Sequence, residues 1–268
     1  MSPTVLRGLH TWTTPVAIVL LWEVLTRLGV LDQRFFVPLS EVVMTIIAQL
    51  TDGRLGGDIA ITIQRLLISF AIAAVLGVAI GIASGVWRTF ELLIRPVTDT
   101  LYPLPKIALL PLFIIIVGRG EIAYIMTAFA TAFFQIIIST RSSVRSIDSE
   151  IIEAGRNFGA TGWKYVTKLL FPAISGPLFN GLRLGMATCL ITLIAAEFVG
   201  AETGIGAMIR RAYQQFAVDE MYAGLVLTGL LGLLINLLFR VLEPVLLPWQ
   251  RGASGTGDQS LRALSCTS

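Results

Sequence analysis

The feature that most constrains this chain is a series of apolar segments, each near the length needed to cross a lipid bilayer. A spanning helix needs about 20 mostly apolar residues. Because lipid offers backbone groups no water, and no segment alternates with period two, these spans are expected to be helices. The chain is therefore predicted to be an all-α membrane protein with about six spans, at residues 14–28, 66–87, 97–117, 121–140, 174–199 and 221–247.

Composition supports this class and excludes several others. Only 14% of the residues are charged and the mean hydropathy is +0.80, whereas soluble domains carry roughly 25% charged residues. The net charge of +3 is scattered, so no nucleic-acid partner is predicted. Cys189 and Cys266 suggest no disulfide framework, and His10 is too distant from them in sequence to build a metal site. No catalytic, cofactor-binding or metal-binding residue is predicted.

The two ends are expected to lie outside the transmembrane domain, residues 14–249. Residues 1–13 are predicted as a cytoplasmic N-terminus. A cleaved signal peptide is the alternative for this end, but Glu23 follows the apolar run at once and no small-x-small cleavage site appears before Arg27. Residues 250–268 are rich in Gly, Ser and Thr and are predicted to be a disordered cytoplasmic tail.

The loops indicate how the chain is oriented. Lys and Arg residues are more frequent on the side that holds the N-terminus, which places the loop 141–172 in the cytoplasm. The loop between the first two spans contains a helical stretch, residues 41–50, for which Ser40 is expected to be the N-cap.

Small and polar residues recur every fourth position in three spans and so share one helix face. A glycine-rich stripe in the second span favours close helix packing. For the polar stripes of the fourth and sixth spans, packing and lining of a translocation pathway are both open. The candidate pathway residues are Thr131, Gln135 and Asn236 on these stripes, with Thr188 and Thr192 of the fifth span.

The cytoplasmic loop carries a short amphipathic helix. Asp148 or Ser149 can cap it, and Gly159 suits a left-handed C-terminal stop. Its apolar face must be covered by either the membrane surface or a groove on a soluble partner. Because Glu150 and Glu153 lie beside Arg156, the mixed charges favour the partner. A second helix, residues 163–170, is expected to end near Pro172.

This loop resembles the EAA loop of binding-protein-dependent ABC importer permeases. That pattern is Glu-Ala-Ala, three residues, Gly, nine residues, then Ile-x-Leu-Pro. The spacings from Glu153 to Gly159 and from Gly159 to Pro172 match it. The departures are Gly155 for Ala, Leu169 for Ile, and Phe171 for Leu.

Further segments resemble the nitrate/sulfonate/taurine-type branch of the family, over about residues 22–249. They are residues 103–112 with 118–121, 181–185, 195–200 with 204–206, and the loop 36–40. Two positions depart from the branch: Ile116-Val117 stands where many relatives have an aromatic pair, and Lys106 where many have proline or a neutral residue. These departures leave the substrate open.

The resemblance implies a type I ABC importer permease fold that forms a homodimer in the bacterial cytoplasmic (inner) membrane. It also implies two partner ATPase subunits, which bind ATP and Mg, and an extracytoplasmic solute-binding protein. The lysines of this chain lie in no phosphate-binding Gly-rich loop, so ATP hydrolysis is assigned to the partner and the chain is not expected to be an enzyme. The predicted ATPase-coupling residues are Glu153, Ala154, Gly155, Arg156, Phe158 and Gly159.

Charged residues inside the spans suggest further candidates. Prolines interrupt the third expected span. Lys106 follows its Pro-x-Pro and would either attract a small anionic solute or be a snorkelling or ion-paired lysine. Glu197 and Arg183 are predicted as a gate or as structural ion-pair residues. A nitrate, sulfonate, taurine or related organic anion is the expected solute.

Two other classes remain as alternatives. An ion-coupled secondary transporter or channel would act without an ATPase and would need coupling-ion residues deep in the bundle. A membrane scaffold subunit would transport nothing. The secondary transporter or channel would have no use for the EAA-like loop.

Overall fold

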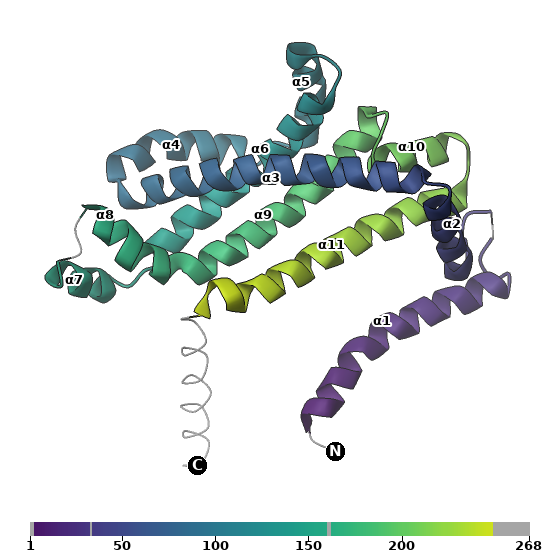
Figure 1. Cartoon of the computed structure of the whole chain (residues 1–268), viewed down its shortest axis with the longest axis horizontal. Helices are drawn as coiled ribbons and strands as arrows, with labels where there is room; N and C mark the ends of the chain where they lie inside the picture. Colours follow the sequence, from purple (N-terminus) through teal and green to yellow (C-terminus); the bar gives the residue numbers. More distant parts are fainter. Residues whose placement is uncertain (1–2, 33, 160–161, 249–268) are drawn as a thin grey trace. The chain divides into compact units, whose positions relative to one another are not determined.

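The structure, a computed structural model, describes residues 3–32, 34–159 and 162–248, and these ranges contain helices and no strand (Figure 1). The tail predicted to be disordered, residues 250–268, lies outside the described residues. The elements are α1 (Pro3–Arg27), α2 (Leu39–Thr51), α3 (Arg54–Val86), α4 (Arg88–Leu101), the 3₁₀ helix η1 (Lys106–Leu109), α5 (Leu110–Val117), α6 (Glu121–Arg145), α7 (Ser149–Asn157), α8 (Gly162–Lys164), the π-helix η2 (Tyr165–Leu170), α9 (Phe171–Gly200), α10 (Ile205–Gln214) and α11 (Val218–Leu246).

Four stretches of the described chain are long and apolar enough to cross a membrane. They are Arg54–Val86, Glu121–Arg145, Tyr165–Gly200 and Val218–Leu246, and to within one residue they contain the second, fourth, fifth and sixth expected spans. The first expected span falls in α1, also to within one residue, but the described part of α1 is not among the helices long and apolar enough to span. The third is a bent pair, Arg88–Leu101 with Lys106–Val117, whose two arms meet at 91°.

Prolines explain the bend in the third expected span. Pro103 and Pro105 lie between α4 and η1. Each proline lacks a backbone N–H and disfavours helical geometry in the residue before it. The chain therefore cannot continue α4 as a straight helix, and the interruption expected from the sequence becomes a sharp turn.

The chain divides into two compact units. The first unit contains residues 1–63 and 194–230, and the second contains residues 64–193 and 231–268. The long helices α3, α9 and α11 contribute residues to both. Each unit has its own packing, and the two are described in turn.

In the second unit the glycine stripe of α3 lies against α6. A Cβ atom added to Gly77 would lie 3.0 Å from the Cβ of Ile136, and one added to Gly81 would lie 2.5 Å from the Cβ of Thr140. Gly85 faces Val144 in the same way. These distances leave no room for a side chain, so the expectation of close helix packing is confirmed for this stripe.

The same two helices are joined by polar groups nearer their N-terminal ends. Arg65 is 2% exposed and holds the carboxylate of Glu121, with Nη2 2.6 Å from Oε1. One turn later, the Ser69 hydroxyl donates to the carbonyl oxygen of Ile125 at 3.2 Å. Residue numbers rise together along both helices, so α3 and α6 run parallel.

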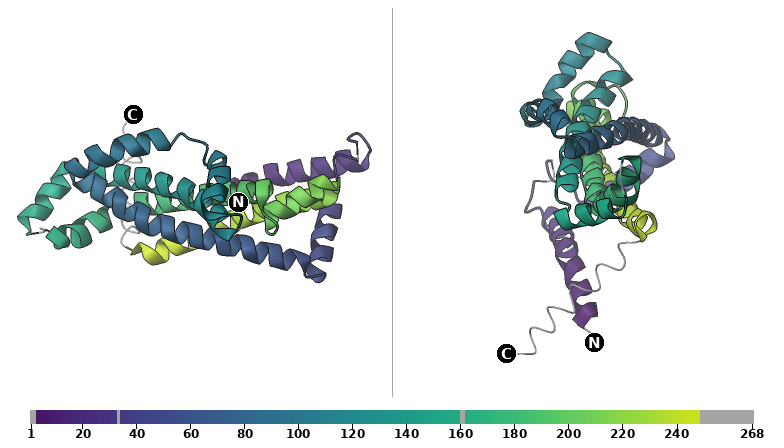
Figure 2. Two further views of the ribbon diagram at one scale, coloured as in Figure 1. Left: turned by 90° about the horizontal axis from the view of Figure 1, so that it is seen from above. Right: turned by 90° about the vertical axis from the view of Figure 1, so that its left-hand side faces the viewer.

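An adjacent face of α6 packs against α9. A Cβ on Gly181 would lie 2.7 Å from that of Ser139, and a Cβ on Gly185 would lie 2.7 Å from Cγ1 of Ile136. Ile136 therefore fills the space beside glycines of both α3 and α9. Within this unit, α6 is the central helix (Figures 1 and 2).

Helix α4 is held to α6 by ion pairs. Arg145 pairs with Glu91, and Arg141 pairs with Asp99 at 3.3 Å. Glu91 is 1% exposed whereas Leu93 on the same helix is 68% exposed. The polar face of α4 therefore points inward and its apolar face outward.

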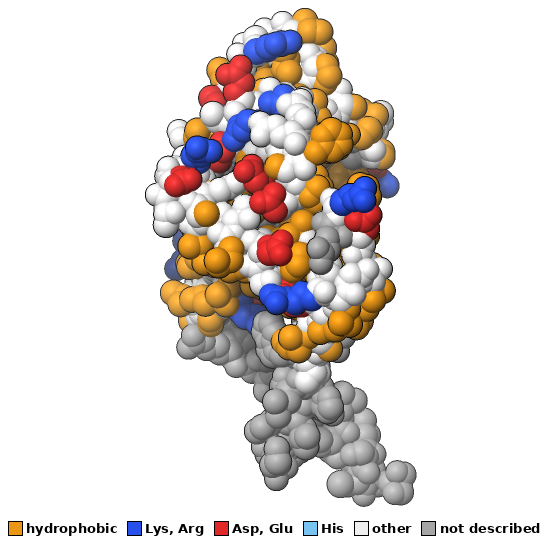
Figure 3. Space-filling view, turned by 90° about the vertical axis from the view of Figure 1, so that its right-hand side faces the viewer, with side chains coloured by type: hydrophobic (Ala, Val, Ile, Leu, Met, Phe, Trp, Pro, Cys, Tyr) orange, Lys and Arg blue, Asp and Glu red, His pale blue; other side chains and the backbone are white. Residues whose placement is uncertain are grey.

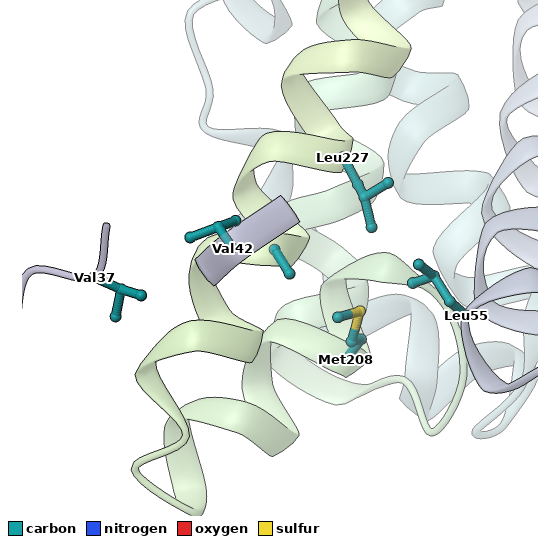
Figure 4. Packing of buried hydrophobic residues seen from close by; sticks show 6 residues of the cluster. Val37, Val42, Leu55, Met208 and Leu227 are labelled. Atoms are coloured by element: carbon teal, nitrogen blue, oxygen red, sulfur yellow. The ribbon is translucent and has the colours of Figure 1, made fainter. Parts of the chain in front are cut away.

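The first unit has an apolar core in which α2, α3, α10 and α11 meet. Its buried side chains are Val37, Val42, Leu55, Met208, Ala223 and Leu227, and Figure 4 shows how they converge.

The start of α2 corrects one expectation. The helix begins at Leu39 with Pro38 in the capping position, so the prediction that Ser40 is the N-cap was wrong. The Ser40 hydroxyl and N–H instead donate to Glu23, at 2.7 and 3.2 Å. A carboxylate is favoured at the positive N-terminal end of a helix. Glu23 of α1 therefore accepts hydrogen bonds at the start of α2, in place of a capping side chain from α2 itself.

Candidate functional site

The candidate site is the coupling segment, which we define as α7 with the turn Phe158–Gly159. The N–H groups of Ile151 and Ile152 donate to the carbonyl oxygen of Asp148, at 3.1 and 3.3 Å, so the chain enters the helix at this residue. Glu150 lies in the first turn, where the positive end of the helix favours a carboxylate. The short helix expected from the sequence is present.

The apolar face of α7 is largely uncovered in the chain. Phe158 is 92% exposed, Ile151 is 44% exposed, and Ala154 is exposed beside them. Glu153 is exposed on the same helix. A helix of nine residues with an uncovered apolar face gains little stability by itself, because most helical stability in proteins comes from burying that face. The segment is therefore shaped as a contact surface.

Gly155 lies on the buried side of α7, where the chain returns beneath it. A Cβ atom on Gly155 would lie 2.6 and 2.8 Å from the two methyl carbons of Leu169. The sequence gives Gly155 and Leu169 as two separate departures from the EAA pattern. The structure makes them neighbours, with the leucine methyls filling the space that an alanine side chain would occupy.

The turn after α7 takes the form expected from the sequence. The N–H of Phe158 donates to the carbonyl oxygen of Ala154 at 3.1 Å, and Gly159 has φ +79°. Only glycine adopts this left-handed conformation without cost, so Gly159 ends the helix and leaves Phe158 projecting. The side chain of Arg156, a sixth predicted coupling residue, lies outside the described part of the structure.

The return path corrects a second expectation. The helix expected at residues 163–170 does not end near Pro172, because the π-helix η2 runs directly into α9. The N–H of Phe171 bonds the carbonyl oxygen of Val166, five residues earlier. Pro172 has no N–H to donate, but the first turn of a helix tolerates proline. Helical backbone therefore runs from α8 through η2 into α9, so the chain that returns beneath α7 continues into a membrane-spanning helix.

That junction is anchored in a core of its own. Leu170 and Ile174 are fully buried and cluster with Val144 and Leu178. Ile147 and Tyr165 pack against this cluster from either side of the coupling segment. A displacement of α7 would therefore act on the start of α9 and the end of α6.

Lys106 is buried by the fold at the bend of the third span. Its Nζ donates to the carbonyl oxygens of Leu101, Tyr102 and Leu104, at 2.9, 2.6 and 2.8 Å. It also lies over the rings of Tyr102 and Phe134. All three donors are occupied by the C-terminal end of α4, where a cation is favoured. The geometry favours a structural lysine over direct contact with solute.

Gln135 is brought close to the same bend. Its amide oxygen accepts from the hydroxyl of Tyr102 at 2.8 Å, and its Nε2 is 3.3 Å from the Ser139 hydroxyl. Tyr102 is 44% exposed, so this polar pair reaches the surface of the unit. Thr131, one turn earlier, is half-buried and its hydroxyl points to the carbonyl oxygen of Thr127.

The other pathway candidates lie on α9 and α11. Thr188 bonds its own helix at Leu184 and Gly185, and Thr192 is half-buried. Asn236 accepts from Nε of Arg183 at 2.8 Å. Arg183 of α9 is thus hydrogen-bonded to an amide on α11, which is consistent with a structural role for this residue.

Glu197 is fully buried in the first unit. Its carboxylate accepts from the hydroxyl of Thr62 at 2.9 and 3.0 Å and from the N–H of Gly206 at 3.1 Å. The N–H of Ile205 in turn donates to the Thr62 hydroxyl at 2.9 Å. A Cβ on Gly204 would lie 2.6 Å from the same carboxylate. These contacts fasten the start of α10.

Sequence reasoning missed the ion pairs that connect distant helices. Arg65 with Glu121, Arg145 with Glu91, and Arg211 with Asp58 at 2.6 Å each join residues more than fifty positions apart. Only the general rule that charges in membrane segments need partners pointed to them. It could not have said which charge meets which. Within the described ranges, no three His, Cys, Asp or Glu side chains converge to hold a metal ion.

Comparison with known proteins decides the family. Residues 73–252 match the model of the binding-protein-dependent transport system inner membrane component. The chain belongs to this family. The match contains the whole coupling segment.

Individual relatives agree with this assignment. A Bacillus subtilis protein with the provisional name aliphatic sulfonates transport permease protein SsuC is 30% identical over 90% of this chain and 87% of its own length. The taurine transport system permease protein TauC of Escherichia coli is 27% identical over 88% of both chains. The nitrate import permease protein NrtB of Synechocystis is 29% identical over 74% of this chain and 72% of its own.

The fold also has a solved counterpart. A chain of the MetNI methionine ABC transporter in an inward-facing conformation matches with a TM-score of 0.64 at 23% identity, over 72% of this chain and 96% of that one. At this identity the likeness shows the fold. It confirms the type I ABC importer permease architecture predicted from the EAA-like loop.

Proposed function

We propose that this chain is the membrane-spanning permease subunit of an ATP-driven, binding-protein-dependent importer. The observation that carries the proposal is the uncovered apolar face of α7, with Phe158 92% exposed, within a chain of this transport family. The segment fits a groove on a cytoplasmic ATPase subunit, as helices with apolar anchors at helical spacing do. Glu153, Ala154, Arg156, Phe158 and Gly159 form the contact, and Gly155, which lies against Leu169 on the buried side of α7, supports it from within the chain.

The ATPase is favoured over a lipid surface as the partner of α7. Helices that lie on membranes have a long apolar face and a polar face rich in Lys and Arg. Here the helix is nine residues long and includes Glu150 and Glu153. Its mixed charges suit a protein groove. Gly155 of α7 packs against Leu169 of η2, and η2 runs on into α9, which provides a route by which movement of the ATPase reaches a spanning helix.

The remaining partners follow from the family. Two copies of the chain form the pathway, two ATPase subunits bind ATP and Mg, and an extracytoplasmic solute-binding protein delivers the solute. The location is the bacterial cytoplasmic membrane. This chain supplies no site for ATP.

The transported solute is a small anion, such as a sulfonate, taurine or nitrate. The names of three relatives support this class. The charge of Lys106 adds to it. No carboxylate of the described residues lies within ion-pair distance of this amine, so its positive charge at the bend is stabilised by carbonyl dipoles and aromatic rings and is not neutralised by a negative charge. Such a charge favours an anion nearby even without direct contact.

Reconstitution tests the proposal against autonomous transport. The chain is placed in vesicles with and without its ATPase subunits and solute-binding protein, and uptake of radiolabelled taurine and nitrate is measured. Uptake that requires both partners and ATP is the expected result. Uphill uptake by the chain alone, driven by an ion gradient, would instead identify a secondary transporter.

The coupling contact has its own variant. Glu153→Lys should reduce ATPase association and ATP-driven uptake at least tenfold, because it reverses a charge on the contact face. Glu41→Lys, an equal charge change on the exposed side of α2, is the matched control and should leave both unchanged. Normal association and transport by Glu153→Lys would remove Glu153 from the coupling contact.

A further inference from the structure

The turn between α10 and α11 contains an unusual residue. Phe216 has φ +56° and is the one non-glycine with positive φ in the described chain. The N–H of Ala217 donates to the carbonyl oxygen of Ala212 at 2.9 Å, and that of Phe216 to Tyr213 at 3.2 Å. This is the closing pattern of a helix whose next residue is usually glycine. A bulky side chain in that position is strained.

The Phe216 side chain contributes little packing to the fold. Phe216 is 85% exposed, so its ring buries little surface against its own chain. Glycine would adopt the same backbone without strain and would expose no aromatic ring. A strained residue whose side chain serves no internal contact is a candidate for an external one.

The surroundings of Phe216 are those of a protein contact in water. Tyr213, on the last turn of α10, is 60% exposed, and Gln214 and Gln215 are exposed between the two aromatics. Aromatic residues with polar neighbours are enriched where proteins bind each other. Lipid is a poor partner for this turn, because Asp219 and Glu220 begin the next helix.

A polar pocket opens beside the turn. It has a volume of about 170 Å³, and Gln215 is one of its walls. Arg211 is fixed there by the Asp58 carboxylate and the Glu202 carbonyl oxygen, each at 2.6 Å. The remaining lining residues are Gln49, Arg54, Leu55, Met208 and Glu220. The face in Figure 3 likewise shows acidic and basic side chains among apolar ones.

The side of the membrane selects the partner, and this step rests on the proposed function. The stretch Tyr165–Gly200 is long and apolar enough to cross the bilayer. In the sequence this candidate span comes after the coupling segment and before α10, so the chain crosses the bilayer once between them. If α7 meets an ATPase in the cytoplasm, the turn at Phe216 faces the side from which the solute arrives.

We propose that Phe216 is an anchor on which the extracytoplasmic solute-binding protein docks, with Tyr213 at its side and the polar pocket receiving a polar side chain of that protein. The strained backbone directs the ring away from its own chain and toward the partner. A buried aromatic anchor of this kind commonly dominates the affinity of an interface.

Two variants separate docking from structure. Phe216→Gly removes the ring and relieves the backbone strain. Phe216→Ala also removes the ring, but the backbone strain remains. Phe216→Trp keeps an aromatic anchor, and Gln214→Ala is the control on the same turn. Each is prepared as the complex with ATPase subunits in nanodiscs, and binding of the solute-binding protein encoded with this chain is measured by biolayer interferometry.

The expected result is a pair of opposite effects. Phe216→Gly should raise the thermal midpoint of the complex while weakening binding of the solute-binding protein about tenfold or more. Phe216→Ala should weaken binding equally without the gain in stability. Phe216→Trp and Gln214→Ala should bind nearly as the parent does.

Three results would overturn the proposal. Unchanged binding by both Phe216→Gly and Phe216→Ala would exclude an anchor. A lower thermal midpoint for Phe216→Gly would show that the ring supports the fold. Loss of association between copies of the chain, with unchanged binding of the solute-binding protein, would assign the turn to the dimer. ATPase co-purification is recorded in each case, because its loss in the parent would count against the proposed function and not against docking.

Discussion

Phe158 after α7 and Phe216 after α10 occupy similar places on two helix ends. Both rings are almost wholly exposed, at 92% and 85%. After α7 the left-handed residue is Gly159, with φ +79°, and Phe158 beside it keeps ordinary geometry. After α10 the phenylalanine itself is left-handed, with φ +56°.

The chain thus presents an exposed aromatic ring in two different ways. Where glycine makes the turn, the ring is carried at no conformational cost and its position depends on the packing beneath the helix. Where phenylalanine makes the turn, the strain of about 1–2 kcal/mol is borne by the fold. The first arrangement suits a segment that moves with its partner, and the second suits a fixed anchor.

The largest effect expected from this comparison is at Phe158. Phe158→Ala should lower ATP-driven uptake at least tenfold, because the ring is the main apolar group that α7 offers an ATPase groove. The measurement is uptake by proteoliposomes that contain the ATPase subunits. Phe35→Ala, which removes another exposed ring far from the coupling segment in the sequence, should transport normally. Equal loss in both variants would mean that the effect is not one of coupling.

Gly159→Ala should destabilise the turn after α7 but leave the ring of Phe158 in place. An L-residue at φ +79° costs about 1–2 kcal/mol, so the last turn of α7 should open roughly five- to thirtyfold more often. Hydrogen exchange of the α7 amides measures this opening. Gly159→Asn should show a smaller increase, since asparagine tolerates this conformation better. Equal exchange in the parent and the Ala variant would contradict the account of the turn.

The neighbouring position tests the packing beneath α7. Gly155→Ala should gain about 1 kcal/mol of helix propensity, but the contact with Leu169 should cancel the gain. Leu169→Ala removes the leucine methyls, so the gain in helix propensity should then appear. The double variant should be more stable than the sum of the single changes predicts. A double-mutant cycle on thermal unfolding gives the coupling, expected in the range of about 0.5–3 kcal/mol. If the two stability changes are additive, Gly155 and Leu169 do not interact as described.

The smallest effect is expected from Phe216→Asn. Asparagine adopts the left-handed region more readily than phenylalanine, so the change should stabilise the chain by a few tenths of a kcal/mol up to about 1 kcal/mol. Thermal unfolding of the purified chain in detergent measures it. Ala217→Asn, beside the strained residue, is the control and should give no gain in stability. Destabilisation by Phe216→Asn would mean that the ring has a structural contact.

Much of the fold was predictable because lipid imposes simple rules. Four expected spans coincide with long apolar helices, and the break of the third followed from Pro103 and Pro105. The close packing of the glycine stripe also followed from its spacing, since residues four apart share a face. Ser40 shows the limit: as a capping residue it was a sound choice locally, but a carboxylate from α1 took that place.

For the candidate site, the sequence located the segment but not its contacts. Glu153, Gly159 and Pro172 were found by their spacing, which is a property of the chain alone. That Gly155 meets Leu169, or that Lys106 is enclosed by three carbonyl oxygens, depends on how the chain folds back on itself. Local sequence patterns carry no information about contacts between segments that meet only when the chain folds back.

The sequence by itself determined that the chain spans a membrane, that it is helical, and that one loop has the form of a coupling segment. Hydropathy and residue spacing suffice for this, because the cost of exposing polar backbone in lipid acts on each segment separately. Only the tertiary structure decided which charges meet, as for Arg65 and Glu121, and which residue takes the left-handed turn at Phe216. Both depend on the packing of neighbouring helices, which fixes side-chain partners and backbone geometry together.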